Sequence, residues 1–356
     1  MERGRLQGLD GLRGIAAAGV GLHHIFYHFA SWQIAVAPLT AVADWLKTSG
    51  WTLVDLFFVL SGYVFAHVYL REDVYLRDDG LSKPQGFADF WVARVARLYP
   101  LHLVTLLIVA LITLGNPANT ATAFLAHLGM AQAFVSPVAG TFNQASWSIS
   151  IEMVCYLIFS LTLLAGRRVL IWTSVLLIFI AAEMLWLTGS PGGPWADDVL
   201  WRGLLGFFLG QCLWQGRDAL ARIPGGVLVM VFCAGIWLQH GSYSPLLPLT
   251  LLSWPAALLL CLRLRVFAAR PMQWLGDRSY AIYLVNLPII TGTTALMNVK
   301  ALNIWQIMAV QLSLALAILL ASEASYRWLE KPARRSIRQA WSHRRAARVT
   351  VLAPTI

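Results

Sequence analysis

Two residues that could carry acid–base and charge chemistry lie on one apolar stretch near the start of the chain, residues 9–28. Arg13 and His24 are eleven residues apart, which is almost three helical turns. Both side chains would therefore lie on the same helix face, ~16 Å apart along the axis. Burying an ionisable side chain inside a membrane span costs free energy, so such a residue indicates a functional site before a structural one. The alternative for His24 is a hydrogen-bonded packing role between helices.

Three more polar residues are expected at a similar depth to His24. Counted from the ends of their apolar segments, His24 and Asn286 both lie ~18 Å from the inner side of a core ~30 Å thick. Glu152 lies ~9 Å from the outer side, and Asp55 is slightly shallower on that side. An imidazole, a carboxylate and an amide at one level fit a general base, an orienting acid and a hydrogen-bonding group. Structural pairing is the alternative for both carboxylates.

A second set of candidates lies nearer the inner surface. Arg94 and Arg97 are three residues apart on one expected helix, and Arg13 lies at the same end of its own segment. Guanidinium groups suit phosphates, so the three arginines could hold a donor with a phosphate head and a long arm that reaches His24. Coenzyme A has that shape. The alternative is a basic patch that contacts lipid headgroups.

The composition is typical of an all-α membrane protein. The 356 residues are 58% hydrophobic and 12% charged, with a mean hydropathy of +0.64. Long apolar runs recur throughout the chain, which indicates a polytopic helical bundle. We expect about ten transmembrane helices. They are roughly 12–31, 51–70, 98–115, 146–165, 169–188, 199–215, 224–239, 246–262, 274–296 and 304–328.

The loop charges predict the orientation. Most Lys and Arg residues fall in loops on one side, while Lys47, Arg202 and Lys300 fall on the other. This alternation places both termini in the cytoplasm. Residues 1–338 are expected to form one transmembrane domain, followed by a basic and flexible cytoplasmic tail over 339–356. The location that follows is the inner (cytoplasmic) membrane, with multiple passes.

Several classes of function are set aside. The net charge of +10 is explained by loop topology and anionic lipids, so no nucleic-acid partner is expected. The four cysteines have no paired spacing, and no HExxH, GxxxxGK[ST] or GxSxG motif occurs. His24 and His28 have a spacing that metal ligands use, but no carboxylate motif accompanies them, so no metal site is predicted.

Six motifs in order along the chain resemble those of the acyltransferase 3 family of integral-membrane O-acyltransferases. They are LDGLRGIAA with Arg13 followed by His24, VDLFFVLSGYV at 54–64, RVARLYPLH at 94–102, SWSISIEMVCY at 146–156, LGDRSYAIYLVNLPI at 275–289 and RWLEKPARR at 327–335. The resemblance covers almost the whole chain. Asn286 departs from the pattern, because the family commonly has a histidine there. An amide orients a partner but does not exchange a proton near neutral pH.

The resemblance implies acyl transfer from cytoplasmic acyl-CoA, usually acetyl-CoA, to a hydroxyl of an extracytoplasmic glycan or similar acceptor. Acyl-CoA would be a co-substrate, with no permanently bound cofactor, and membrane lipids would be partners. His24 and Arg13 fall on the pattern that the family depends on, Arg94 and Arg97 on its basic pair, and Glu152 on its SWS-x3-E segment. His24 and Glu152 would be catalytic, and the three arginines would hold the donor. The cavity-lining candidates are Asp55, Trp147, Ser148, Tyr280, Tyr283 and Asn286. His24 would act as a general base or carry the acyl group transiently.

An alternative class is a transporter or flippase that moves a lipid-linked or acylated molecule without covalent chemistry. The same polar layer would then be a substrate path. The acceptor, the length of the acyl chain and the oligomeric state stay open from the sequence.

Overall fold

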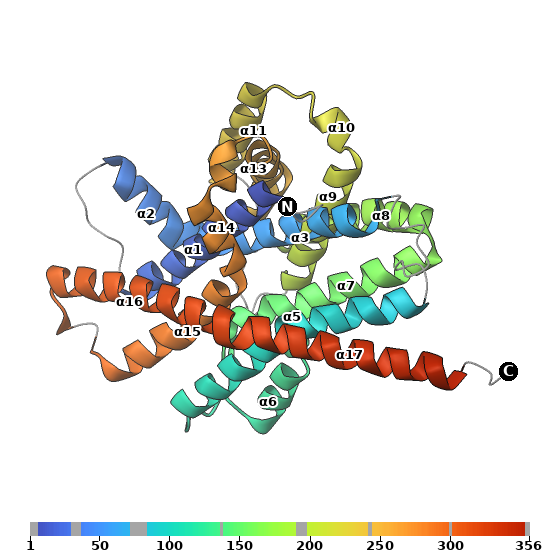
Figure 1. Ribbon diagram of the computed structural model, residues 1–356. Helices are drawn as coiled ribbons and strands as arrows, with labels where there is room; N and C mark the ends of the chain where they lie inside the picture. The colour runs from blue at the N-terminus through green and yellow to red at the C-terminus, as the bar shows by residue number, and fades with distance from the viewer. Residues whose placement is uncertain are drawn as a thin grey trace.

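A computed structural model describes residues 6–29, 37–71, 84–135, 138–189, 198–240, 244–298 and 301–352. These residues form helices joined by turns, with no strand among them (Figure 1). The helices in chain order are α1 (Gln7–Phe29), α2 (Ala37–Ser49), α3 (Leu53–Tyr69), α5 (Pro84–Ile112), α6 (Ala121–Leu128), α7 (Trp147–Ala165), α8 (Arg167–Thr188), α9 (Val199–Gln215), α10 (Arg217–Leu220), α11 (Gly225–Leu238), α12 (Leu246–Pro248), α13 (Trp254–Cys261), α14 (Arg270–Asp277), α15 (Ser279–Leu296), α16 (Ile304–Ser325) and α17 (Lys331–Leu352). The expectation of an all-α protein is confirmed.

Within this described part, 6 helical segments are long and apolar enough to cross a membrane, which indicates a multi-pass membrane protein. They are Thr40–Tyr69, Gly86–Ile112, Gln144–Ala165, Arg167–Thr188, Ser279–Leu296 and Ile304–Arg345. Gly225–Leu238 and Leu246–Cys261 are shorter apolar helices. Each of the ten expected spans coincides with helical residues, but the count of ten and the cytoplasmic termini stay predictions.

Helix α1 lies among several partners and fixes the position of the first candidate residues. It packs on α14, α15, α2, α3 and α16 (Figure 1). The crossing with α14 is close, because a Cβ added to Gly14 would lie 2.6 Å from the backbone nitrogen of Gly276. A Cβ on Gly276 would lie 2.2 Å from the carbonyl oxygen of Asp10. Glycine at both positions therefore holds α1 against the start of the segment that continues into α15.

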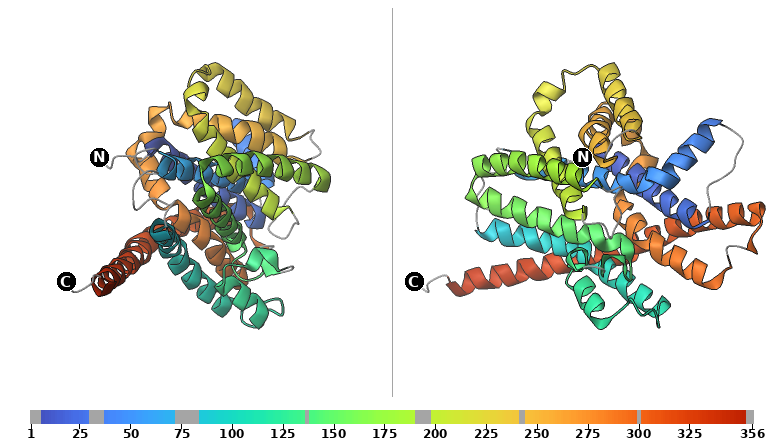
Figure 2. Two further views of the ribbon diagram at one scale, coloured as in Figure 1. Left: turned by 90° about the vertical axis from the view of Figure 1, so that its right-hand side faces the viewer. Right: turned by 180° about the vertical axis from the view of Figure 1, so that it is seen from behind.

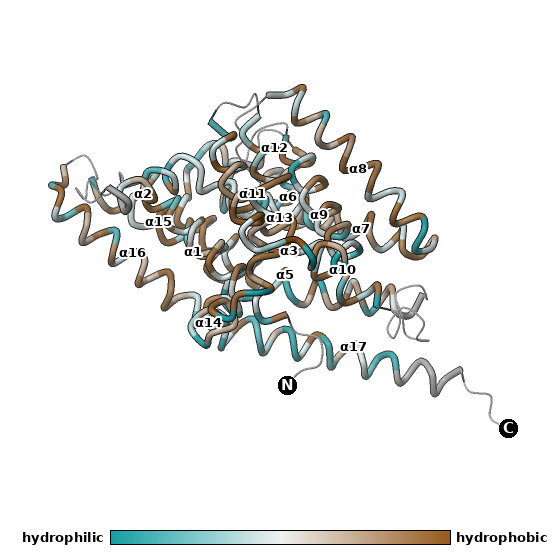
Figure 3. Tube along the Cα trace, turned by 90° about the horizontal axis from the view of Figure 1, so that it is seen from above, coloured by the Kyte–Doolittle hydropathy of each residue, from teal (hydrophilic) through white to brown (hydrophobic). Residues whose placement is uncertain are grey.

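Helices α16 and α17 form a long rod along one side of the molecule (Figures 1 and 2). A π-helical segment, Tyr326–Glu330, joins them without a break. In Figure 3, apolar residues recur along α8 and α16, and hydrophilic residues along α17.

The C-terminal segment is helical to Leu352, and its last residues, 353–356, lie outside the described part. The flexible tail over 339–356 stays a prediction. Helix α17 packs beside α5. Trp341 Nε1 donates to Asp89 Oδ1 at 2.6 Å, and Arg345 donates to Asp89 Oδ2 at 2.5 Å. These contacts attach the polar helix α17 to α5, a pairing that the hydropathy of the segment does not predict.

Candidate functional site

His24 is held by Asn286, which lies on α15. His24 Nδ1 is 2.7 Å from Asn286 Oδ1. The amide nitrogen of Asn286 donates to the carbonyl oxygens of Ile282 at 3.0 Å and Tyr283 at 2.7 Å, so the amide oxygen must face His24. An amide oxygen only accepts, so Nδ1 of His24 carries the proton and Nε2 carries the lone pair. The structure thus presents a neutral imidazole with a lone pair on Nε2, for which the described residues supply no hydrogen-bond donor.

His24 lines a cavity of about 270 Å³, which we call the histidine cavity. His23 lines it too, and its Nδ1 donates to the carbonyl oxygen of Leu46 at 2.9 Å. The polar and aromatic residues of the lining come from α1, the α2–α3 region, the start of α7, α9 and α15. They are His23, His24, Tyr27, His28, Lys47, Thr48, Trp51, Gln144, Trp147, Arg202 and Tyr283.

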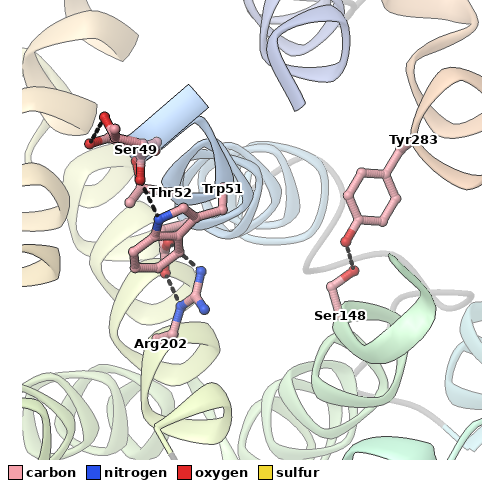
Figure 4. Close-up of polar contacts among 8 residues, drawn as sticks. Ser49, Trp51, Thr52, Ser148, Arg202 and Tyr283 are labelled. Atoms are coloured by element: carbon pink, nitrogen blue, oxygen red, sulfur yellow. Dashed lines mark hydrogen bonds and ion pairs between the residues drawn. The ribbon is translucent and has the colours of Figure 1, made fainter. Parts of the chain in front are cut away.

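A buried ion pair lies beside the histidine cavity, which its arginine lines. Arg202 of α9 donates from Nε and Nη2 to the two carboxylate oxygens of Asp55, at 3.0 and 2.9 Å. Its guanidinium carbon lies 4.8 Å from the ring centre of Trp51 (Figure 4). The same carbon lies 4.9 Å from the ring centre of Trp147. The prediction that Arg202 lies in a loop on the outer side is therefore wrong, because the side chain is buried between helices and is 1% exposed. Asp55 thus makes a structural ion pair, which was the alternative to a role in the chemistry.

A second cavity, which we call the central cavity, lies beside the first. It has a volume of about 100 Å³ and is lined by the three predicted arginines, Arg13, Arg94 and Arg97, and by Ser148, Glu152, Tyr156, Tyr280 and Tyr283. Arg94 lies over the ring of Phe65, 4.8 Å from its centre. Arg97 has no hydrogen bond or ion pair to any residue that the structure describes. Two guanidinium groups without carboxylate partners favour an anionic ligand.

Glu152 lies in the central cavity and does not contact His24. Its Oε1 accepts from Ser61 Oγ at 3.3 Å and from the hydroxyl of Tyr156. The partner of His24 is the amide of Asn286 instead. Of the residues expected at the depth of His24, Asn286 therefore contacts it, whereas Glu152 lies in the cavity that the arginines line.

The wall between the two cavities is formed by Tyr283 and Val54, which line both. The hydroxyl of Ser148 donates to that of Tyr283 at 2.9 Å (Figure 4). The Tyr283 hydroxyl in turn donates to the carbonyl oxygen of Ala145 at 2.7 Å. These bonds join α15 to the start of α7, so Tyr283, together with Val54, lies between the arginines and the histidine.

A third cavity, which we call the α17 cavity, continues from the central cavity and has a volume of about 460 Å³. The two share Arg13, Val64, Arg97, Ser279 and Tyr280. The α17 cavity is also lined by charged residues of the C-terminal helical segments, Glu330, Lys331 and Arg334. Asp10, His67 and Asp277 also line it. The three cavities thus lie in series, with shared walls.

All of the predicted site residues line these cavities except Asp55 and Asn286. These two bond to Arg202 and His24, which line the histidine cavity. Sequence reasoning missed Arg202, Trp51, Lys331 and Arg334. A charged residue within the apolar run 199–215 was the available signal for Arg202. No group of three or more potential metal-ligating side chains occurs among the residues described, so no metal centre is assigned.

The helical membrane architecture and the arginine–histidine cavities define the class of protein. Residues 6–322 match the family model described as an acyltransferase domain, and the chain belongs to this family. The resemblance to the acyltransferase 3 family, drawn from the six motifs, is confirmed over nearly the whole chain.

Particular relatives are similar at modest identity. A putative peptidoglycan O-acetyltransferase, YrhL, of Bacillus subtilis is 27% identical over 377 aligned positions, covering 92% of this chain and 55% of the relative. The peptidoglycan O-acetyltransferase OatA of Listeria monocytogenes is 26% identical, covering 92% of this chain and 56% of the relative. The acyltransferase MdmB of Streptomyces mycarofaciens is 34% identical over 176 positions, which is 46% of this chain and 41% of that protein.

The chain spans a little over half the length of the first two relatives. No solved structure matches the chain.

Proposed function

We propose that this protein is an O-acyltransferase that moves an acyl group, by default acetyl, from cytoplasmic acyl-CoA to a hydroxyl of an extracytoplasmic glycan. The observation that carries the proposal is the series of cavities: unpaired arginines line one side of Tyr283, and the free Nε2 of His24 belongs to the other side. The family membership and the printed functions of the peptidoglycan-acetylating relatives support it.

On the donor side, Arg13, Arg94 and Arg97 hold the phosphates, and the pantetheine arm extends through the central cavity toward Tyr283. Arg94 has a buried Nε without a hydrogen-bond partner among the described residues, which leaves a donor for an anion. Glu152 acts on this side through Ser61 and Tyr156, and not by orienting His24.

On the acceptor side, the hydroxyl oxygen attacks the thioester carbonyl carbon and its proton passes to Nε2 of His24. The C–O bond forms, the C–S bond breaks, and the thiolate that leaves takes the proton from His24. In the second route Nε2 attacks the thioester carbon, the C–S bond breaks and the thiolate leaves. The hydroxyl oxygen then attacks the acyl carbon, the C–N bond to His24 breaks, and the hydroxyl proton ends on the thiolate. Both routes need a lone pair on Nε2, which the Asn286 contact provides.

The acceptor is a glycan because the histidine cavity is bordered by aromatic rings and polar groups. Trp51 is partly exposed there, and Tyr27 and Gln144 line the same cavity. Aromatic faces pack on apolar sugar faces, and polar side chains bind hydroxyl groups. Peptidoglycan is the acceptor that the relatives' names suggest, and the inner membrane is the location that gives both substrates access.

The test uses purified full-length protein in proteoliposomes with labelled acetyl-CoA and cell-wall glycan fragments on opposite sides. We expect label to appear as an ester on the glycan. His24→Ala should abolish transfer without loss of folded protein, and the remote, exposed His240→Ala serves as the matched control. Full activity of His24→Ala would remove the assigned base. Movement of an unmodified solute without transfer of label would favour the transporter instead.

A further inference from the structure

We propose that the C-terminal helix α17 is part of the donor site, with Arg334 and Lys331 binding the phosphate on the ribose of the CoA-type donor. This inference rests on the proposed function, because it assigns a second part of the same ligand. It adds binding residues from a segment that sequence reasoning treated as the border of a flexible tail.

The order of the cavities leads to this assignment. Arg13 and Arg97 stand at the junction of the central and α17 cavities, while Lys331 and Arg334 line only the α17 cavity. In acyl-CoA the acyl group and pantetheine come first, then the diphosphate, and then the phosphorylated ribose with its adenine. A donor whose acyl group points at Tyr283 would therefore leave its diphosphate at Arg13 and Arg97. Its ribose phosphate would then reach the α17 cavity.

The charges around Arg334 also favour an anion. Arg94, Arg97 and Arg338 lie close enough to act electrostatically on Arg334. None of these four guanidinium groups has a carboxylate within ion-pair distance in the part of the chain that the structure describes. Like charges that converge in this way repel each other, and a bound phosphate would remove that repulsion.

Carboxylates also line the α17 cavity, and they limit where a phosphate fits. Asp10 pairs with Arg13 at 3.1 Å, and Glu330 accepts from Ser325 Oγ at 3.3 Å. Asp277 is the third. These groups accept hydrogen bonds, so they suit the ribose hydroxyl and the adenine amino group better than a phosphate. The cavity thus offers both kinds of partner that a phosphorylated nucleoside needs.

Helix α17 is held firmly enough to present these side chains. Lys331 Nζ lies 4.4 Å from the ring centre of Tyr326, at the start of the helix. Three turns further on, Trp341 and Arg345 bind Asp89 of α5, which is the helix that carries Arg94 and Arg97. The two sets of basic residues are therefore fixed against each other by direct contacts between α17 and α5.

The experiment measures equilibrium binding of CoA and of dephospho-CoA, which lacks only the ribose phosphate. Full-length protein is used in nanodiscs of zwitterionic lipid. We expect the wild type to prefer CoA by roughly tenfold, as a charge-assisted phosphate contact would give. Arg334→Gln should lose most of that preference and bind dephospho-CoA as the wild type does. Lys331→Met should act in the same direction. Arg335→Gln is the matched control, because Arg335 is exposed and lines none of the three cavities.

Four outcomes overturn the inference. Equal affinity of the wild type for the two compounds, or the same loss in Arg334→Gln and Arg335→Gln, removes the ribose-phosphate contact while leaving the proposed function intact. If Arg334→Gln changes only the stabilisation of the protein by anionic lipid, tested in nanodiscs with phosphatidylglycerol, then Arg334 binds headgroups. A wild type that binds neither compound removes the proposed donor, and this inference with it.

Discussion

The hydroxyl groups of Tyr283 and Ser148 meet at 2.9 Å in the wall between the central and histidine cavities. The Tyr283 ring also packs edge-on to Phe57, with ring centres 5.8 Å apart. An acyl group that passes from the arginines to His24 has to cross this wall. In the proposed function, the Tyr283–Ser148 contact lies on the route of the acyl group and keeps water away from the thioester.

Tyr283→Phe should make that wall leaky. The ring stays, but the bonds to Ser148 and to the carbonyl of Ala145 are lost, each worth about 1 kcal/mol. We expect the ratio of thioester hydrolysis to glycan acylation to rise by roughly three- to tenfold. The measurement is CoA release against ester formed in the same sample. Ser148→Ala, which removes only one of the two bonds, should have a smaller effect. An unchanged ratio in both variants would show that the wall does not control water.

Asn286 should control the tautomer of His24. Asn286→Leu keeps a similar volume but leaves Nδ1 of His24 without its acceptor. The imidazole is then free to rotate and to place its proton on Nε2. We expect kcat to fall by on the order of a hundredfold. The KM for acetyl-CoA should be nearly unchanged, because the proposed donor site lies on the other side of Tyr283.

The control for Asn286→Leu is a measurement of CoA binding. Binding of CoA to the variant should match the wild type, which shows that the fold and the central cavity are intact. Wild-type turnover in Asn286→Leu would contradict the orienting role and leave His24 positioned by its helix alone.

The Arg202–Asp55 pair should be costly to break from one side. Each partner is at most 1% exposed, and two hydrogen bonds join them. Arg202→Met leaves a buried carboxylate unpaired, so we expect about 3–5 kcal/mol of destabilisation. Thermal unfolding in detergent would report it. The double variant Asp55→Leu, Arg202→Met should recover much of the loss. If the destabilisation of the double variant equals the sum of the two single destabilisations, the ion pair is not the source of the loss in stability.

Periodicity and depth predicted part of the candidate site well. Helical spacing placed Arg13 and His24 on one helix, and equal depth placed Asn286 at the level of His24, which Asn286 contacts in the structure. Depth could not place Glu152 beside His24, because it gives the height of a residue and not the direction of its side chain. The direction is set by which helix face packs on which neighbour.

Side-chain pairs between segments that are distant in the chain could not be predicted from the sequence. Arg202 binds Asp55, which lies 147 residues earlier, and Trp341 binds Asp89, which lies 252 residues earlier. Charge patterning assigns an arginine near a span end to a loop, and it assigns a polar helix to solvent. Both rules describe an isolated segment. They fail where another helix supplies the partner.

His127 should make the segment between α5 and α7 sensitive to acid. It is fully buried, its Nε2 lies 3.1 Å from Thr141 Oγ1, and its carbonyl accepts from His102 Nε2 at 2.7 Å. Burial, with a smaller contribution from His102, lowers the pKa of His127 from 6.5 to about 4. The unfolded chain therefore binds a proton near pH 6.5, while the folded protein resists it until about pH 4.

Stability should be unaffected by this group above pH 6.5 and should fall as the pH drops from 6.5 toward 4. The loss is about 2 kcal/mol near pH 5. We expect proteolysis or hydrogen exchange over 113–143 to increase in that range. His127→Gln keeps hydrogen-bonding capacity but does not titrate, so it should remove most of the pH dependence. The exposed His240→Gln should keep it. Identical pH profiles in the wild type and His127→Gln would show that a different group opens the segment.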